Sequence, residues 1–239
     1  MADKYDNLYQ HGNLAIIMDG QYTGTMKLSE LLNHGDTGIG TTNALGVEMI
    51  VVDGLPYGIN GKGEVEILDG DAETVPYANM HYSSSNLPTF DLENLNAAQT
   101  ADFLIAGNEL KNTFVGVRID GTFNNVVARA ADKQETPFKK FAEVASSQNL
   151  FTKDEVTGTI IGYYSPELYN GASAAGMHLH FLSDDRTFGG HLLEYDVKVA
   201  TATVQRFSEL QMHFPVNSKE FLNNDIEMKM IRDSIESAE

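Results

Sequence analysis

The part of this chain that most constrains its fold and chemistry is Gly176-Met177-His178-Leu179-His180-Phe181, followed by Gly189-Gly190-His191. Successive side chains of a β-strand point to opposite faces, so His178 and His180 are predicted to lie on the same face. The polar run Ser183-Asp184-Asp185-Arg186 is typical of a short turn, after which His191 would return on the neighbouring strand. The pattern therefore predicts a β-hairpin that carries three imidazoles close together.

Three imidazoles from adjacent strands form half of a coordination shell for a borderline metal ion, zinc above all. Three protein ligands leave a position for water or substrate, which is typical of catalytic rather than structural zinc sites. The sequence contains no cysteine, which excludes disulfides, thiolate nucleophiles, Cys-ligated zinc and iron–sulfur clusters. The alternative is that these residues are ordinary strand and turn histidines.

The composition is that of a globular protein with an acidic surface. With 239 residues, 42% of them hydrophobic, the chain is long enough for one large domain or two small ones. Its 16 basic and 34 acidic residues give a net charge of −18, which argues against nucleic acid or an anionic membrane as a partner. An anionic substrate would therefore need a local cation, either a metal ion or a buried arginine. No apolar run is long enough to span a bilayer, and the first residues lack the features of a secretory signal, so a cytoplasmic location is expected.

Strand patterns outnumber helical ones along the chain. Apolar runs that end in Asp53-Gly54 and Asp69-Gly70 predict hairpins. Helices are expected at residues 27–34, 97–108 and 138–148 and from Phe221 to the end, a loop at 83–96, and a short helix followed by a strand within residues 1–20. Strands and helices do not alternate strictly, so the sequence favours an α+β protein with mixed β-sheets and a few short helices over a doubly wound parallel sheet.

The expected organisation is two sheet-containing halves, which could also form one compact unit. Residues 1–95 would make an N-terminal mixed α/β half, and residues 96–239 a C-terminal mixed β-sheet half that carries the histidine hairpin. Within the second half, Asp120-Gly121 indicates a turn between two strands, which would place Arg118 and Arg129 on the two arms of a hairpin.

Three further charged residues could take part in a reaction, but none of them indicates a site by itself. Glu48 opens an apolar strand, where a carboxylate is commonly solvated. Arg118 and Arg129 lie within strand patterns, where an arginine is costly to bury unless it is paired. The segment Gly38-Ile39-Gly40-Thr41-Thr42 lacks the Gly-Lys-Ser/Thr of a phosphate loop, so close backbone packing or a turn is the better interpretation.

Taken together, four segments resemble the alpha-acetolactate decarboxylase family. They are His34-Gly35-Asp36-Thr37-Gly38-Ile39-Gly40-Thr41, then Glu48 through Asp53-Gly54, then Val117-Arg118-Ile119-Asp120-Gly121-Thr122-Phe123 through Arg129, and Gly158-Thr159-Ile160-Ile161-Gly162 through the three histidines. The resemblance runs from about residue 7 to the C-terminus, in order and with similar spacing. One departure is visible, because Gly46-Val47 precedes Glu48 where the family usually has Asp-Gly.

The resemblance implies a set of site residues. It implies zinc ligands at His178, His180 and His191, catalytic roles for Glu48 and Arg129, and a glutamate of the C-terminal tail at the metal site. The family's ending aligns best with Glu239, and Glu236 is the alternative. Thr41 is implied as a substrate-binding residue beside Arg129. Arg118 matches a position where lysine also occurs, which favours a structural role.

The activity implied by the resemblance is the zinc-dependent decarboxylation of 2-acetolactate to acetoin and CO2, the acetoin-forming step of the butanediol pathway. Zinc would stabilise the enediolate as a Lewis acid, Arg129 would hold the carboxylate, and Glu48 or Glu239 would protonate one face. The family also implies a homodimer. The alternatives are a three-histidine zinc hydrolase or lyase acting on another small substrate, and a non-catalytic module that binds a small acid.

Overall fold

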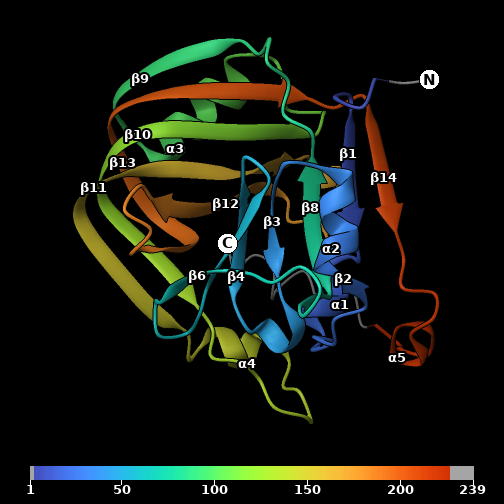
Figure 1. Ribbon diagram of the computed structural model, residues 1–239. Helices are drawn as coiled ribbons and strands as arrows, with labels where there is room; N and C mark the ends of the chain where they lie inside the picture. The colour runs from blue at the N-terminus through green and yellow to red at the C-terminus, as the bar shows by residue number, and fades with distance from the viewer. Residues whose placement is uncertain (1–2, 227–239) are drawn as a thin grey trace.

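Two β-sheets form the framework of the protein, which the computed structural model describes for residues 3–226 (Figure 1). The first sheet has seven strands in the order β14-β1-β8-β3-β4-β5-β6. Their bounds are β1 Asn7–His11, β3 Thr37–Thr41, β4 Glu48–Val52, β5 Leu55–Ile59, β6 Val65–Ile67, β8 Tyr77–His81 and β14 Glu209–His213. All neighbours are antiparallel except β1 and β14, which come from opposite ends of the chain and pair in parallel. The strand β14 of the first sheet therefore comes after all the strands of the second sheet in the sequence.

The second sheet has five long antiparallel strands in the order β10-β11-β12-β13-β9. Their bounds are β9 Thr89–Asn96, β10 Val115–Ala130, β11 Asn149–Ser165, β12 Gly176–Ser183 and β13 Gly189–Arg206. Because β10 also pairs with β13, strands β10 to β13 close on themselves. The largest apolar cluster lies here, around side chains such as Phe123 and Phe181, which pack edge to face with ring centroids 5.6 Å apart.

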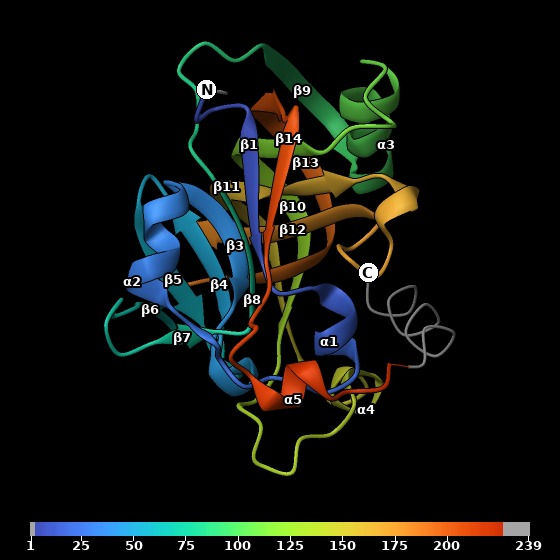
Figure 2. The same ribbon diagram turned by 90° about the vertical axis from the view of Figure 1, so that its right-hand side faces the viewer.

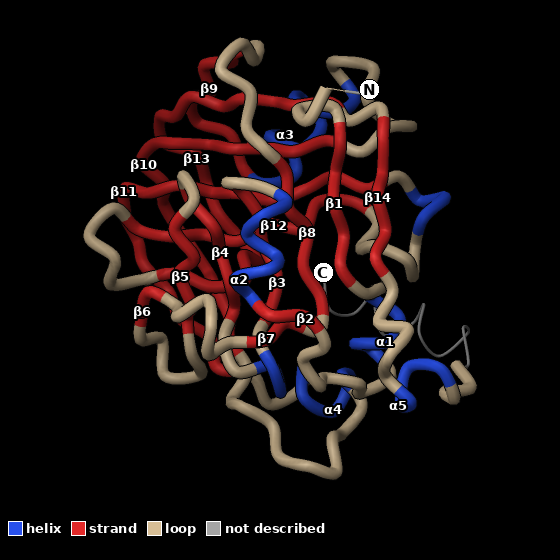
Figure 3. Tube along the Cα trace, turned by 45° about the vertical axis from the view of Figure 1, so that its right-hand side comes forward, coloured by secondary structure: helices blue, strands red, loops and turns tan. Residues whose placement is uncertain are grey.

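The helices are short and lie around the strands (Figure 3). They are α1 Leu14–Met18, α2 Leu28–Leu31, α3 Ala97–Ala101, α4 Phe141–Ala145 and α5 Lys219–Leu222, with 3-10 turns η1 Leu32–His34, η2 Asn43–Leu45 and η4 Glu167–Tyr169 and a π turn η3 Asp102–Ala106. A small sheet pairs β2 Met26–Lys27 with β7 Thr74–Val75. Figure 2 shows α1, α4 and α5 gathered at one end of the molecule. Among residues 3–226, no helix has both the length and the apolar character that a bilayer crossing requires.

The predicted fold class, mixed β-sheets with a few short helices, is confirmed, and the three histidines lie on strands of its second sheet. The predicted order of the first 20 residues is wrong, because strand β1 precedes helix α1. The predicted loop at 83–96 is wrong for its second half, which forms β9 against β13. The division of the chain into halves at residue 95 stays a prediction.

The predicted turn at Asp120-Gly121 is also wrong, because β10 continues through both residues. Asp120 pairs with Thr159 on β11 and with Thr201 on β13, so long partner strands on both sides hold the backbone extended. A side chain at Gly121 would collide with Ala200, so the glycine allows close strand approach rather than a reversal of the chain. Consequently Arg118 and Arg129 lie on one strand.

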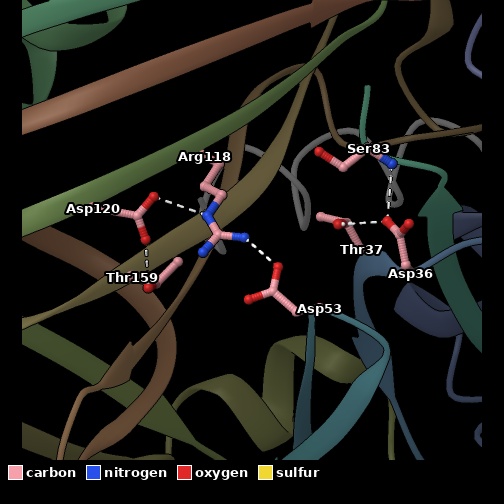
Figure 4. A network of polar contacts seen from close by, with 7 residues as sticks. All are labelled: Asp36, Thr37, Asp53, Ser83, Arg118, Asp120 and Thr159. Atoms are coloured by element: carbon pink, nitrogen blue, oxygen red, sulfur yellow. Dashed lines mark hydrogen bonds and ion pairs between the residues drawn. The ribbon is translucent and has the colours of Figure 1, made fainter. Parts of the chain in front are cut away.

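Arg118 connects the two sheets (Figure 4). Its Nη1 donates to Asp53 Oδ1 of the β4–β5 turn over 2.6 Å, and its Nε donates to Asp120 Oδ2 over 2.8 Å. Asp120 Oδ1 in turn accepts a hydrogen bond from Thr159 Oγ1 over 2.7 Å. Arg118 is not among the residues that line the histidine pocket. Its contacts instead help to hold the two sheets together.

Candidate metal centre

The hairpin formed by β12 and β13 brings the three predicted metal ligands together. His178 and His180 lie on β12, and His191 on β13 is the cross-strand partner of His180. The ring centroids are 5.0 to 5.4 Å apart, and one nitrogen of each ring lies within 4.8 Å of the others. The spacing is small enough for one ion to bind all three imidazoles.

The three imidazoles are neutral near pH 7. Burial, and then the charge of nearby Arg129, lowers the pKa of His178 to about 3. Burial is also the main cause that lowers the pKa of His180 and His191 well below the usual value. A neutral imidazole keeps a lone pair, which is the state that a metal ion requires. The site therefore presents three electron-pair donors rather than three cations.

The tautomer of His180 follows from its contact with the first sheet. Its Nδ1 lies 2.8 Å from the carbonyl oxygen of Met49 on β4. A carbonyl only accepts, so Nδ1 carries the hydrogen and Nε2 keeps the lone pair. Nε2 lies 3.4 Å from Glu48 Oε2. Two electron-rich atoms this close repel each other unless a hydrogen or a positive charge lies between them, so the residues present fit a bound cation.

Three neighbouring strands of the first sheet place Glu48, Thr41 and Tyr77 at the same pocket. Glu48 is the first residue of β4 and the cross-strand partner of Thr41, which is itself the partner of Tyr77 on β8. All three line the pocket, and the side chain of Glu48 is 18% exposed. The Thr41 hydroxyl donates to the carbonyl oxygen of Val47 over 2.9 Å. Its hydrogen is thus engaged with the backbone, and towards a ligand it can act only as an acceptor.

Arg129 places a positive charge beside the histidines. It lies on β10 as the cross-strand partner of His191, and only 6% of it is exposed. Its Nη1 donates to Gln148 Oε1 over 3.0 Å, and its guanidinium carbon lies 5.9 Å from the ring centre of Phe141. Buried charges act through a lower effective dielectric than exposed ones, so this guanidinium interacts strongly with any anion in the pocket.

The opposite wall of the pocket is apolar. It is formed by Leu14, Ile17 and Met18 of α1, Leu45 of η2 and Phe141 of α4. The free volume is about 50 Å³, which suits a small ligand. An apolar wall keeps water away from the polar groups opposite and so strengthens their interactions with a ligand.

The sequence analysis missed this wall, Tyr77 and Gln148. These residues come from separate segments, and their own neighbours in the sequence carry no chemical motif, so no local signal could have found them. The tail residues Glu239 and Glu236 lie outside the described residues.

The sequence model of the family described as Alpha-acetolactate decarboxylase matches residues 8–228. The chain belongs to the alpha-acetolactate decarboxylase family. The match spans both sheets and every pocket residue named above.

Individual relatives agree over nearly the full length. The chain is 34% identical to the alpha-acetolactate decarboxylase of Lactococcus lactis subsp. cremoris, over 97% of this chain and 98% of the relative. The crystal structure of alpha-acetolactate decarboxylase from Bacillus subtilis superposes with a TM-score of 0.93 at 29% identity, covering 98% of this chain and 99% of that one. A Staphylococcus aureus protein of unknown function, described as similar to alpha-acetolactate decarboxylase, gives a TM-score of 0.93 at 36% identity, covering 98% and 100% of the two chains.

The predicted family and the predicted enzyme class, a decarboxylase, are therefore confirmed. The cytoplasmic location and the homodimer stay predictions. So do the identity of the metal ion and the roles of the individual site residues.

Proposed function

We propose that this protein is a zinc-dependent decarboxylase that converts 2-acetolactate to acetoin and CO2. The observation that carries the proposal is the arrangement of three neutral imidazoles, Glu48 and buried Arg129 around one small pocket, in a chain of this family. His178, His180 and His191 would hold the metal ion. The finer assignments below are part of this proposal.

The substrate sets three requirements. 2-Acetolactate carries a carboxylate and a ketone on either side of a tertiary alcohol carbon. When the bond to the carboxylate breaks, its electron pair can delocalise only into the ketone, which gives an enediolate. The site must hold the carboxylate, stabilise negative charge on oxygen, and return a proton to carbon. A zinc ion bound by the three histidines would supply Lewis-acid stabilisation of that negative charge.

Arg129 would bind the substrate carboxylate. The protein as a whole carries a charge of −18, so an anion reaches the pocket only if a local cation offsets this field. A guanidinium offers paired donors that match the two oxygens of a carboxylate. Held at one end by Arg129, the substrate would be oriented so that the bond to be broken lies out of the plane of the ketone.

Glu48 would handle the proton. It lines the pocket, with Oε2 only 3.4 Å from His180 Nε2. As the carboxylic acid it could deliver its proton to one face of the enediolate and then recover a proton from water. Delivery from a fixed position on one side would yield a single enantiomer of acetoin. The alternative donor, Glu239, stays a prediction.

The test is acetoin formation from racemic 2-acetolactate, measured before and after chelator treatment and after restoring zinc. We expect acetoin that is lost with the chelator and recovered with zinc. Folded, metal-replete protein that forms no acetoin would overturn the proposal. Ester or amide hydrolysis would then point to a three-histidine hydrolase, and binding of the acid without turnover to a binding module.

A further inference from the structure

The geometry around Arg129 points to a further functional residue. Arg129 Nη1 donates to Gln148 Oε1 over 3.0 Å. A guanidinium has no acceptor, so the amide of Gln148 can face it only with its oxygen. The orientation of this amide is therefore determined by Arg129.

The backbone around Gln148 is tied to helix α4. Gln148 lies between α4 and β11, and its backbone nitrogen donates to Ala145 of α4 over 3.5 Å. Phe141 at the start of the same helix lies 5.9 Å below the guanidinium of Arg129 and lines the pocket. Phe141 and Val144 are buried in one cluster with α1, so the helix is anchored. One short anchored segment thus supplies both a hydrogen-bond acceptor and an aromatic face to Arg129.

A purely structural role does not explain the side chain of Gln148. Its Nε2 is buried and has no hydrogen-bond partner among the described residues. An unsatisfied buried donor is unfavourable, so the fold alone gives no reason for an amide at this position. Among residues 3–226, the side chain of Gln148 makes one hydrogen bond, which it accepts from Arg129.

We propose that Gln148 is a positioning residue that aims Arg129 at the carboxylate of a small 2-hydroxy acid, an inference that rests on the proposed function. Arginine has a long flexible side chain, and fixing one end of the fork reduces the conformational freedom lost when a substrate binds. A neutral amide does this without cancelling the positive charge. A glutamate at the same place would form an ion pair with Arg129 and compete with the substrate carboxylate.

The experiment compares Gln148→Met, Gln148→Glu and the matched control Gln134→Met in the zinc-loaded protein. Gln134 lies on the loop between β10 and α4, is half-buried, and donates to the carbonyl oxygen of Asp132. The measurements are KM and kcat for 2-acetolactate, calorimetric binding of 2-hydroxyisobutyrate, zinc content and thermal unfolding. The analogue has the hydroxyl and carboxylate but no ketone, so its binding is measured without turnover.

We expect Gln148→Met to raise KM and weaken analogue binding by about tenfold, the factor for one hydrogen bond to a charged group. Zinc content and the unfolding temperature should match those of Gln134→Met. Gln148→Glu should weaken analogue binding at least as much, although it keeps the size and the acceptor of glutamine. A purely structural role predicts instead that Gln148→Glu behaves like the parent, and that result would overturn the proposal.

A second comparison separates an effect through Arg129 from any other. In an Arg129→Ala background, Gln148→Met should cause no further loss of analogue binding, because the group that it positions is gone. An equal loss in both backgrounds would overturn the proposal. A parent protein that binds the analogue but forms no acetoin would refute the proposed reaction and leave the Gln148 comparison valid. A parent protein that forms acetoin but does not bind the analogue would overturn the proposed role of Gln148 and leave the proposed reaction standing.

Discussion

At His180, both ring nitrogens have a defined neighbour. Met49 receives the hydrogen of Nδ1, and Nε2 is turned towards His178, His191 and Glu48. A ring held this way loses little freedom on binding a metal ion, which is the usual role of such backbone contacts around a metal site.

We expect His180→Ala to lose zinc, because two imidazoles bind the ion far more weakly than three. Elemental analysis of dialysed protein checks this, with His213→Ala on the exposed strand β14 as the control. Stoichiometric zinc in His180→Ala would show that the ligand set is wrong.

Glu48→Gln tests the proton donor with almost no change in shape. We expect zinc to remain, since the three histidines are intact, and kcat to fall by about 100-fold or more, the lower range for loss of a general acid. Acetoin assays with zinc analysis on the same sample measure both quantities. Glu66→Gln on the exposed edge strand β6 is the control. Full activity in Glu48→Gln would remove Glu48 from the mechanism.

At the scale of the elements, the start of β13 is shaped by a backbone that only glycine adopts easily. Gly190 has φ +135°, and a side chain there would lie 2.6 Å from the carbonyl oxygen of Arg129. This glycine lets β13 approach β10 closely beside the cross-strand pair His191 and Arg129. The close pairing of the two strands therefore sets the distance between the imidazole of His191 and the guanidinium.

Gly190→Ala should weaken zinc binding by about tenfold although it removes no ligand, because the strand must shift to make room. The free energy of unfolding should fall by roughly 1–3 kcal/mol. Zinc competition titrations and urea denaturation measure the two effects. The control is Gly54→Ala. Gly54 also has a positive φ, +82°, but a side chain there meets open space, so this variant shows the effect of backbone strain without a collision. Equal zinc affinity in both variants would contradict the expectation.

For the molecule as a whole, His81 links the two sheets. It lies on β8, its Nδ1 is 2.8 Å from the hydroxyl of Tyr163 on β11, and its ring packs edge-on against Phe207. Burial lowers the pKa of His81 to about 4, and Asp36 offsets part of this effect. The folded protein thus resists protonation of a residue that the unfolded chain protonates near pH 6.5.

This difference predicts a loss of stability in acid. The unfolded chain binds a proton at His81 at a higher pH than the folded protein does. The stability that neutral His81 allows is therefore fully present above about pH 6.5 and is lost as the pH falls towards 4. The loss should be about 3 kcal/mol. Urea denaturation of the parent and of His81→Gln at pH 7 and pH 4.5 measures it, and the variant should lose less stability between the two. Equal losses in both proteins would contradict the assignment to His81.

Several elements could be predicted from the sequence because their signals are local. The histidine hairpin follows from alternation along β12 and from a polar turn, and Glu48 was recognised as the start of an apolar strand. The turn at Asp120-Gly121 was predicted wrongly for the same reason. A turn predicted from two residues takes no account of β11 and β13, which pair with the two edges of β10 and keep its backbone extended.

The sequence by itself determined the class of fold, the three imidazoles on one face and, through its resemblance, the family. These depend on side-chain periodicity and on ordered motifs, which are written along the chain. Only the tertiary structure decided that Met49 orients His180, that α1 lines the pocket, and that Gln148 accepts a hydrogen bond from Arg129. Each of these is a contact between segments distant in the sequence, and such contacts arise from how the two sheets and the helices around them pack, which no local pattern encodes.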